Sequence, residues 1–285
     1  MFGRRSDGKE LKKADAIFRL MPNLMVDRDD SQVFFNQDVP IEAINKYIDE
    51  KAKEGIKLTL IDIFFAAIVR IIAERPKLNR FAINGRTYAR NEIMLCMTIK
   101  KSLDDDAEET NLKIHFKGTE NLFEVRDKLQ KMIEENKSVD TQNGMDKTAK
   151  TLAKIPTGFL KFAIKLIKWL DKHGHLPKFL LEVSPFHTSC YVTNVGSIGI
   201  DSIYHHLYNF GTTSMFFAIG KKKKSYVFED EEMKEERCVN VAFVGDERIC
   251  DGYYYARSFR DLSRYLQHPE LLEVGTPERV KDSQL

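Results

Sequence analysis

The chain has 285 residues, of which 42% are hydrophobic and 31% charged, as in ordinary soluble proteins of one large or two small domains. Its 45 Lys and Arg residues nearly balance 43 Asp and Glu residues, so the net charge of +2 does not predict a nucleic-acid partner. The four cysteines form no CxxC pair, which argues against a metal centre and against a disulfide framework. No signal peptide and no stretch long enough to span a membrane is evident, so we expect a cytoplasmic protein without membrane contact.

The first half of the chain predicts helices and strands in mixed order. Residues 1–20 are basic and polar, and we expect an arm or an edge strand there. Thr59 and Asp62 form a predicted capping pair for an apolar helix that ends at Arg75. The other expected elements of this half are an extended run from Phe34, a helix opened by Pro40, strands over 80–88 and 92–101 with turns at 84–85 and 90–91, and a strand over 111–117.

The second half predicts a helical insertion at about 150–180 within a domain that covers residues 21–272. A polar, mobile connection is expected over 138–150, and a flexible tail over 273–285. The remaining expected elements are helices over 119–136, 157–171 (with a lysine stripe) and 253–267, and strands over 188–195, 214–220 and 239–245. Helices and strands without strict alternation indicate an α+β architecture.

Three short motifs occur in a fixed order along the chain. They are Lys57-Leu58-Thr59 leading to Pro76-Lys77-Leu78-Asn79, then Thr193-Asn194-Val195-Gly196-Ser197-Ile198-Gly199, and then Gly245-Asp246-Glu247-Arg248-Ile249-Cys250-Asp251-Gly252. Together they resemble the catalytic core of the 2-oxo-acid dehydrogenase acyltransferases and the related chloramphenicol acetyltransferase. This resemblance implies a chloramphenicol acetyltransferase-like, mixed-sheet, two-layer fold, and a homotrimer with active sites between its subunits.

The resemblance also assigns roles to three residues of this chain. The Thr193 hydroxyl falls where the family has a group that hydrogen-bonds the oxyanion of the tetrahedral intermediate. Asp251 falls on the aspartate that pairs with an arginine near the N-terminus, for which Arg19 and Arg28 are both candidates. Glu247 stands where the family has its catalytic histidine, and a carboxylate, with its ordinary pKa near ~4.3, is a poor base unless burial raises that pKa.

Other residues could supply the missing base. His205 and His206 are the candidates for a relocated base, although Phe210 stands where a matching motif would have its aspartate, and His187 lies just before the Thr193 strand. The alternative is that these histidines have only structural roles in packing and hydrogen bonding. The four lysines at 221–224 could meet the phosphates of coenzyme A, but we expect a solvated hairpin tip there, and we expect Cys250 to be a packing residue.

Two functional hypotheses follow from these motifs. The first is a transferase that moves an acyl group from an acyl-CoA thioester to a diffusible small-molecule acceptor, with an altered general base. No lipoyl domain or lipoyl group is recognised in this chain, which is why a diffusible acceptor is expected. The second is a catalytically degenerate homotrimer that acts as a binding or regulatory protein. Neither hypothesis involves a metal, and the residues that would bind coenzyme A are not assigned.

Overall fold

The computed structural model describes residues 5–100, 109–137, 143–229 and 232–285. Its centre is a mixed six-stranded sheet in which β7 is parallel to both neighbours, β5 and β8, and the other pairs are antiparallel. The strands in order across this sheet are β2 (Gln32–Pro40), β9 (Glu232–Asp246), β8 (Met215–Glu229), β7 (Cys190–Asn194), β5 (Ile93–Lys100) and β6 (Glu109–Phe116). A small antiparallel sheet joins β1 (Gly8–Glu10), β4 (Arg86–Arg90) and β3 (Arg80–Ile83).

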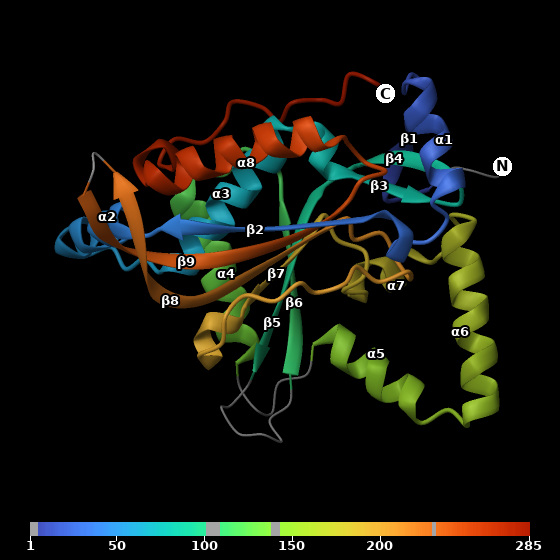
Figure 1. Cartoon of the computed structure of the whole chain (residues 1–285). Coiled ribbons are helices and arrows are strands. Elements are labelled where there is room, and N and C mark those ends of the chain that lie inside the picture. The colour runs from blue at the N-terminus through green and yellow to red at the C-terminus, as the bar shows by residue number, and fades with distance from the viewer. Residues whose placement is uncertain (1–4, 101–108, 138–142, 230–231) are drawn as a thin grey trace.

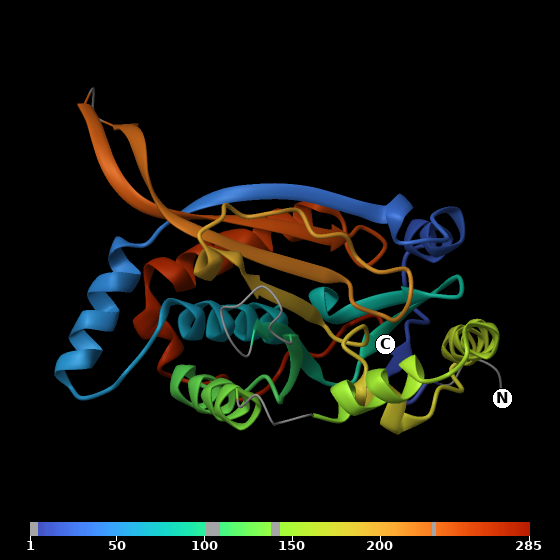
Figure 2. The same ribbon diagram turned by 90° about the horizontal axis from the view of Figure 1, so that it is seen from below.

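Four helices form a layer against one face of the large sheet (Figures 1 and 2). They are α2 (Glu42–Lys53), α3 (Leu60–Glu74), α4 (Leu122–Asn136) and α8 (Gly252–Gln267). Helix α3 lies in the middle of the core and is buried from residue 62 to residue 73, as its apolar sequence predicts. The predicted cap is confirmed, because the Thr59 hydroxyl accepts from the Asp62 amide and the Asp62 carboxylate accepts from the Thr59 amide at 2.8 Å. The α+β, two-layer fold with a mixed sheet is therefore confirmed.

Three more helices lie together at one end of the molecule (Figure 2). These are α5 (Gly144–Ala153), α6 (Thr157–Lys172) and α7 (Lys178–Val183). The mobile connection expected over 138–150 is wrong from residue 144 onward, and residues 138–142 lie outside the described part of the chain. Helix α5 forms because Asn143 and Asp146 make a capping box that offsets the polar composition.

Local geometry changes the strand boundaries in two places. Asn84 and Gly85 both have positive φ angles, so the predicted strand 80–88 is a tight hairpin of β3 and β4. Strands β8 and β9 pair as far as Glu229 and Glu232, well beyond the predicted ends at 220 and 239. The lysines at 221–224 therefore lie within β8 and not at a hairpin tip. Lys223 pairs with Asp38 at 2.9 Å, and Lys224 pairs with Glu235 at 2.8 Å.

Both ends of the described chain pack onto the domain. Strand β1 pairs with β4 as an edge strand of the small sheet, which was one of the two expectations for this segment, and α1 (Ala16–Leu24) follows it. Residues 5–20 are therefore not a separate arm. The tail is also anchored, because the buried Asp282 carboxylate pairs with the buried Arg80 guanidinium, and Val280 donates to the Ala73 carbonyl. The expectation of a flexible tail over 273–285 is wrong for this reason: a short polar sequence is held by a buried ion pair and by hydrogen bonds to the rest of the domain.

Candidate active site

A large cavity is lined by strands β5, β6, β7 and β8 and by the segments that flank β7, and it reaches the end of α4. Its volume is about 910 Å³, within the range of small-molecule sites. Alternation along β7 places Cys190 and Val192 in the core and leaves Tyr191 and Thr193 partly exposed, and both of these line the cavity. We call it the Thr193 cavity. The residues on its walls that matter below are Thr98, Asn111, Pro185, Phe186, His205 and Tyr208.

The hydroxyl groups of this cavity differ in how they are held. The Tyr191 hydroxyl is bonded to Asn111 and to Thr98, whose own hydroxyl donates to the Asn111 side-chain oxygen at 2.8 Å. Burial raises the pKa of Tyr191 well above its ordinary value, so this phenol stays protonated. The Thr193 hydroxyl makes no hydrogen bond with any of the described residues. It can therefore donate to a ligand oxygen.

His205 reaches the same cavity from the segment that follows β7. Its ring stacks on the Phe216 ring with centroids 4.3 Å apart, and Phe216 stacks in turn on Tyr191. The His205 Nδ1 atom lies 2.9 Å from the His206 carbonyl oxygen. A carbonyl oxygen can only accept, so Nδ1 carries the proton and Nε2 is left with its lone pair. Burial lowers the pKa of His205, which favours the neutral ring.

The two histidines predicted as alternatives are separated by the structure. His206 is exposed and does not line the Thr193 cavity, whereas His205 does. His187 is 1% exposed and belongs to a different network: its Nε2 atom lies 3.2 Å from Asp171, and its Nδ1 atom is 2.7 Å from the Ser184 hydroxyl. Burial lowers the pKa of His187, while its pairing with Asp171 opposes that change. His187 therefore holds the end of α6 to the sheet.

Glu247 lies far from Thr193 within one chain. It follows β9 in a turn, is half-buried, and its amide donates to the Ser31 carbonyl at 2.9 Å. Its carboxylate makes no hydrogen bond or ion pair with a residue that the structure describes. Thr193 pairs with Ala218, which pairs with Ala242, five residues before Glu247. Two strand spacings and five residues of rise amount to roughly 20 Å, so the two side chains cannot meet in a single subunit.

The aspartate that forms the buried ion pair is Asp246 and not Asp251. The Asp246 carboxylate is fully buried and accepts from Arg248 at 2.7 and 2.8 Å, and Arg28 lies 3.9 Å away. Burial lowers the pKa of Arg28 to about 10, although the charge on Asp246 opposes this. Asp251 is exposed, and its carboxylate accepts from the Tyr254 amide at 2.8 Å as the N-cap of α8. The expected pair of Asp251 with Arg19 or Arg28 is therefore absent.

Two other features of the motif region have structural roles. Cys250 is completely buried, and burial raises the pKa of its thiol, so this sulfur is not a nucleophile. Arg248 also donates to the Met25 and Val26 carbonyl oxygens. These hydrogen bonds from Arg248 hold the segment before β2 against the end of β9.

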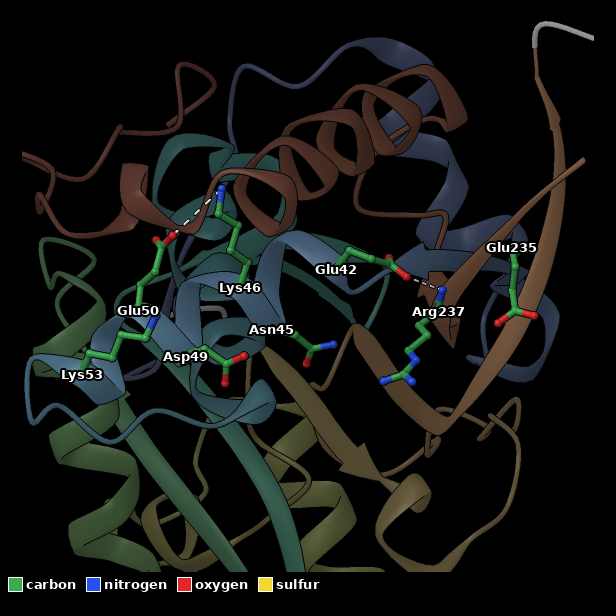
Figure 3. A pocket seen from close by; sticks show the side chains of 8 residues that line it. All are labelled: Glu42, Asn45, Lys46, Asp49, Glu50, Lys53, Glu235 and Arg237. Atoms are coloured by element: carbon green, nitrogen blue, oxygen red, sulfur yellow. Dashed lines mark hydrogen bonds and ion pairs between the residues drawn. The ribbon is translucent and has the colours of Figure 1, made fainter. Parts of the chain in front are cut away.

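A second large hollow lies between α2 and β9, at a distance from these residues. Figure 3 shows its polar walls: the Glu42 carboxylate accepts from the Arg237 amide, and Lys46 pairs with Glu50 at 4.0 Å on the exposed helix face. Its volume is about 610 Å³. The residues that line it are acids, lysines, one asparagine and one arginine, without a histidine or a hydroxyl group. It offers neither an imidazole nor an apolar side chain, so the Thr193 cavity is the better candidate site.

The comparisons with known proteins agree with this architecture. Residues 186–274 match the family model of the 2-oxoacid dehydrogenases acyltransferase (catalytic domain). A comparison with curated protein sequences finds no match. Within the described chain, no helix is both long and apolar enough to cross a membrane.

Several solved structures share the fold at low sequence identity. A probable dihydrolipoamide acetyltransferase from Listeria monocytogenes 4b F2365 is 14% identical, with a TM-score of 0.55 over 91% of this chain and 95% of that one. The Azotobacter vinelandii dihydrolipoamide acetyltransferase is 14% identical, with a TM-score of 0.52 over 89% and 90%. A chloramphenicol acetyltransferase is 10% identical, with a TM-score of 0.53 over 91% and 99%. The resemblance that the motifs indicated is thus confirmed: the chain has an acyltransferase fold of the chloramphenicol acetyltransferase type.

The sequence motifs identified only part of the cavity wall. Tyr191 comes two residues before Thr193 on the predicted strand, so the sequence could have predicted that both side chains lie on the same face of it. Asn111 and Phe186 carried no comparable signal. Asn111 joins the cavity because β5 pairs with both β6 and β7, which brings it to Tyr191, 80 residues further along the chain, whereas Phe186 comes from the segment just before β7.

Proposed function

We propose that this protein transfers an acyl group from an acyl-CoA thioester to a small acceptor that diffuses into the Thr193 cavity, with His205 as the general base. One observation carries the proposal: a hydroxyl on Thr193 without a hydrogen bond to the described residues and an imidazole on His205, oriented by the His206 carbonyl, line the same cavity. The Azotobacter vinelandii enzyme has been studied for the roles of a serine, a histidine and an asparagine in its catalytic mechanism. A hydroxyl and an imidazole would act together here as well.

The proposed reaction has two steps. His205 Nε2 takes the proton of the acceptor, whose oxygen, nitrogen or sulfur attacks the thioester carbonyl carbon. The Thr193 hydroxyl donates to the oxyanion that forms. The intermediate collapses with cleavage of the carbon–sulfur bond, and the proton on His205 passes to the coenzyme A thiolate. No metal is needed for this sequence.

Glu247 gives the second candidate base, because the resemblance implies a homotrimer in which one subunit's motif faces its neighbour. The distance of roughly 20 Å within one chain is compatible with that arrangement but leaves Glu247 no role in its own Thr193 cavity. The degenerate alternative remains a third outcome, in which the fold binds a ligand without turning it over.

Release of the coenzyme A thiol, measured with acetyl-CoA and a panel of amines, alcohols and thiols, tests these possibilities. His205→Gln should lower kcat by about 10²–10⁴-fold, and Thr193→Val, which keeps the shape but removes the donor, by about 10²–10³-fold. Glu247→Gln is the matched control and should retain kcat within a few-fold. The reverse pattern would assign the base to Glu247 across a subunit interface. No turnover by the wild type, with no binding of coenzyme A in calorimetry, would leave the degenerate alternative.

A further inference from the structure

A third cavity, distinct from the hollow between α2 and β9, lies beside the Thr193 cavity and is almost wholly apolar. Its volume is about 270 Å³, and it is a partly open pocket lined by the three helices α5, α6 and α7 together with the chain that follows them. The apolar side chains that define it, which we call the apolar cavity, are Leu152, Ile164, Ile167, Leu180, Val183 and Phe210. The helices all precede residue 186, where the match to the family model begins, so this cavity is built mainly by residues that the family model does not describe.

Both hydroxyl groups that line it already have hydrogen-bond partners. The Ser184 hydroxyl lies 2.7 Å from His187 Nδ1, and the Thr148 hydroxyl donates to the Gly144 carbonyl at 2.7 Å. Neither hydroxyl therefore demands a polar ligand. An apolar cavity of this kind takes an apolar occupant, as an engineered cavity of about 150 Å³ takes a benzene ring.

The two cavities share a wall. Pro185 and Phe186 line both of them. The Phe186 ring packs edge-on against Tyr208, which lines the Thr193 cavity, and against Phe210, which lines the apolar cavity, with centroid distances of 4.7 and 5.6 Å. Rotation of this one ring would join the two spaces.

Hydrogen bonds hold the backbone around the shared wall. The Phe186 carbonyl accepts from the Thr212 amide at 2.7 Å and from the Thr213 amide and hydroxyl at 3.1 and 3.0 Å. Gly211 has a φ of +87°, and a Cβ atom there would lie 2.2 Å from the Phe186 carbonyl oxygen. The close approach of these two segments therefore requires glycine at position 211 and holds the Phe186 backbone in place.

We propose that the apolar cavity receives the tail of a linear acyl chain whose thioester carbonyl lies in the Thr193 cavity, so that the donor is a medium-chain acyl-CoA. This inference rests on the proposed function, because it uses the same reaction site. By the scale of the benzene cavity, 270 Å³ holds roughly ten carbons. Phe186 is the residue that admits the chain.

Chain-length dependence is the expected signature. Each methylene removed from water strengthens binding about fourfold, so burial of as few as three or four of the chain's methylenes gives an effect on the order of a hundredfold, and burial of more gives a larger one. Calorimetry with the full-length protein should therefore find decanoyl-CoA bound at least about a hundredfold more tightly than acetyl-CoA. Equal affinity for the two thioesters would overturn the proposal.

A pair of neighbouring residues on α6 supplies a matched test. Ile167 lines the apolar cavity, whereas Leu166 is 45% exposed and does not. Ile167→Trp should fill the cavity and bring the affinity for decanoyl-CoA to within a few-fold of that for acetyl-CoA, whose own affinity should not change. Leu166→Trp adds the same ring to the same helix and should keep the hundredfold preference. If the two variants behave alike, the chain does not enter this cavity.

Two further experiments ensure that the test of the acyl-chain proposal has a clear outcome. Should Ile167→Trp fail to fold, as judged by circular dichroism, Leu180→Phe fills the same space from α7 and should also abolish the preference. Decanoate alone separates the chain from the thioester: binding of decanoate without a preference for decanoyl-CoA over acetyl-CoA overturns the assignment to a thioester donor. If the protein releases coenzyme A from all acyl-CoA thioesters at the same rate, this inference is refuted and the proposed acyl transfer stands. If binding depends on chain length but no thioester is turned over, the proposed acyl transfer is refuted and this inference stands.

Discussion

The buried contact between α6 and the N-terminal segment should contribute measurably to stability, and Asp171→Asn tests it. The Asp171 carboxylate accepts from Arg5 at 2.8 Å and faces His187 at 3.2 Å, and its side chain is 3% exposed. Burial by itself would raise the pKa of Asp171, but the bonds from His187 and Arg5 outweigh it and lower the pKa from 3.8 to about 2.

The size of this stabilisation follows from the difference between the pKa values of Asp171 in the unfolded and folded states. Each pH unit between the folded and unfolded pKa corresponds to about 1.4 kcal/mol, so the ionised carboxylate stabilises the fold by roughly 2 kcal/mol. Because the folded pKa is the lower one, this stabilisation is present above pH ~4 and is lost as the pH falls towards ~2. Asp171→Asn should therefore lower the free energy of unfolding by roughly 2 kcal/mol at pH 7, and its deficit relative to the wild type should shrink in acid.

Urea unfolding is a suitable assay because the chain's single tryptophan, Trp169, lies on the same helix. Its fluorescence reports on α6, and circular dichroism at the same protein concentration reports on the whole fold. Asp49→Asn, at an exposed position of α2, is the control and should change the free energy of unfolding by less than 0.5 kcal/mol or so. If Asp171→Asn lowers the free energy of unfolding no more than this control does, the buried contacts of Asp171 with Arg5 and His187 do not stabilise the fold as argued.

Three more predictions follow from particular residues. Because burial lowers the pKa of His205, the acid limb of the kcat/KM profile should fall below pH 6.5, and a limb above that value would exclude His205 as the base. Thr59→Ala removes half of the α3 capping box and should cost about 1 kcal/mol in thermal or urea unfolding, whereas Lys57→Ala, at an exposed position, should be nearly neutral. All four cysteines are buried with raised pKa values, so Ellman's reagent should react with them slowly at pH 7 until the protein is denatured; rapid labelling of the native protein would contradict this.

Much of the architecture could be predicted from local sequence. The apolar run from 60 to 74 predicts a helix buried on every side, and Thr59 with Asp62 marks where that helix begins. The alternation around Thr193 predicts a strand with one face in the core. These features depend on neighbours a few residues apart, so the chain itself carries the information.

The grouping of the site residues could not be predicted in the same way. Both Glu247 and His205 were reasonable bases from the sequence, and only the register of β7, β8 and β9 separates Glu247 from Thr193 within a subunit. The segment after β7 returns across the sheet and stacks His205 on Phe216, which brings the other candidate into the cavity.

Ion pairs show the same division between local and distant information. The motif around residue 247 contains two aspartates, and the sequence alone does not distinguish the one that is buried against arginines from the one that caps a helix. The structure assigns the first role to Asp246 and the second to Asp251. The tail looked disordered because its composition is polar, yet Asp282 is buried against Arg80, 202 residues away. The sequence by itself therefore determined the fold class, the motifs and most helices and strands, whereas partners far apart in the chain were decided by the tertiary structure, because their contacts form only when the sheet is assembled.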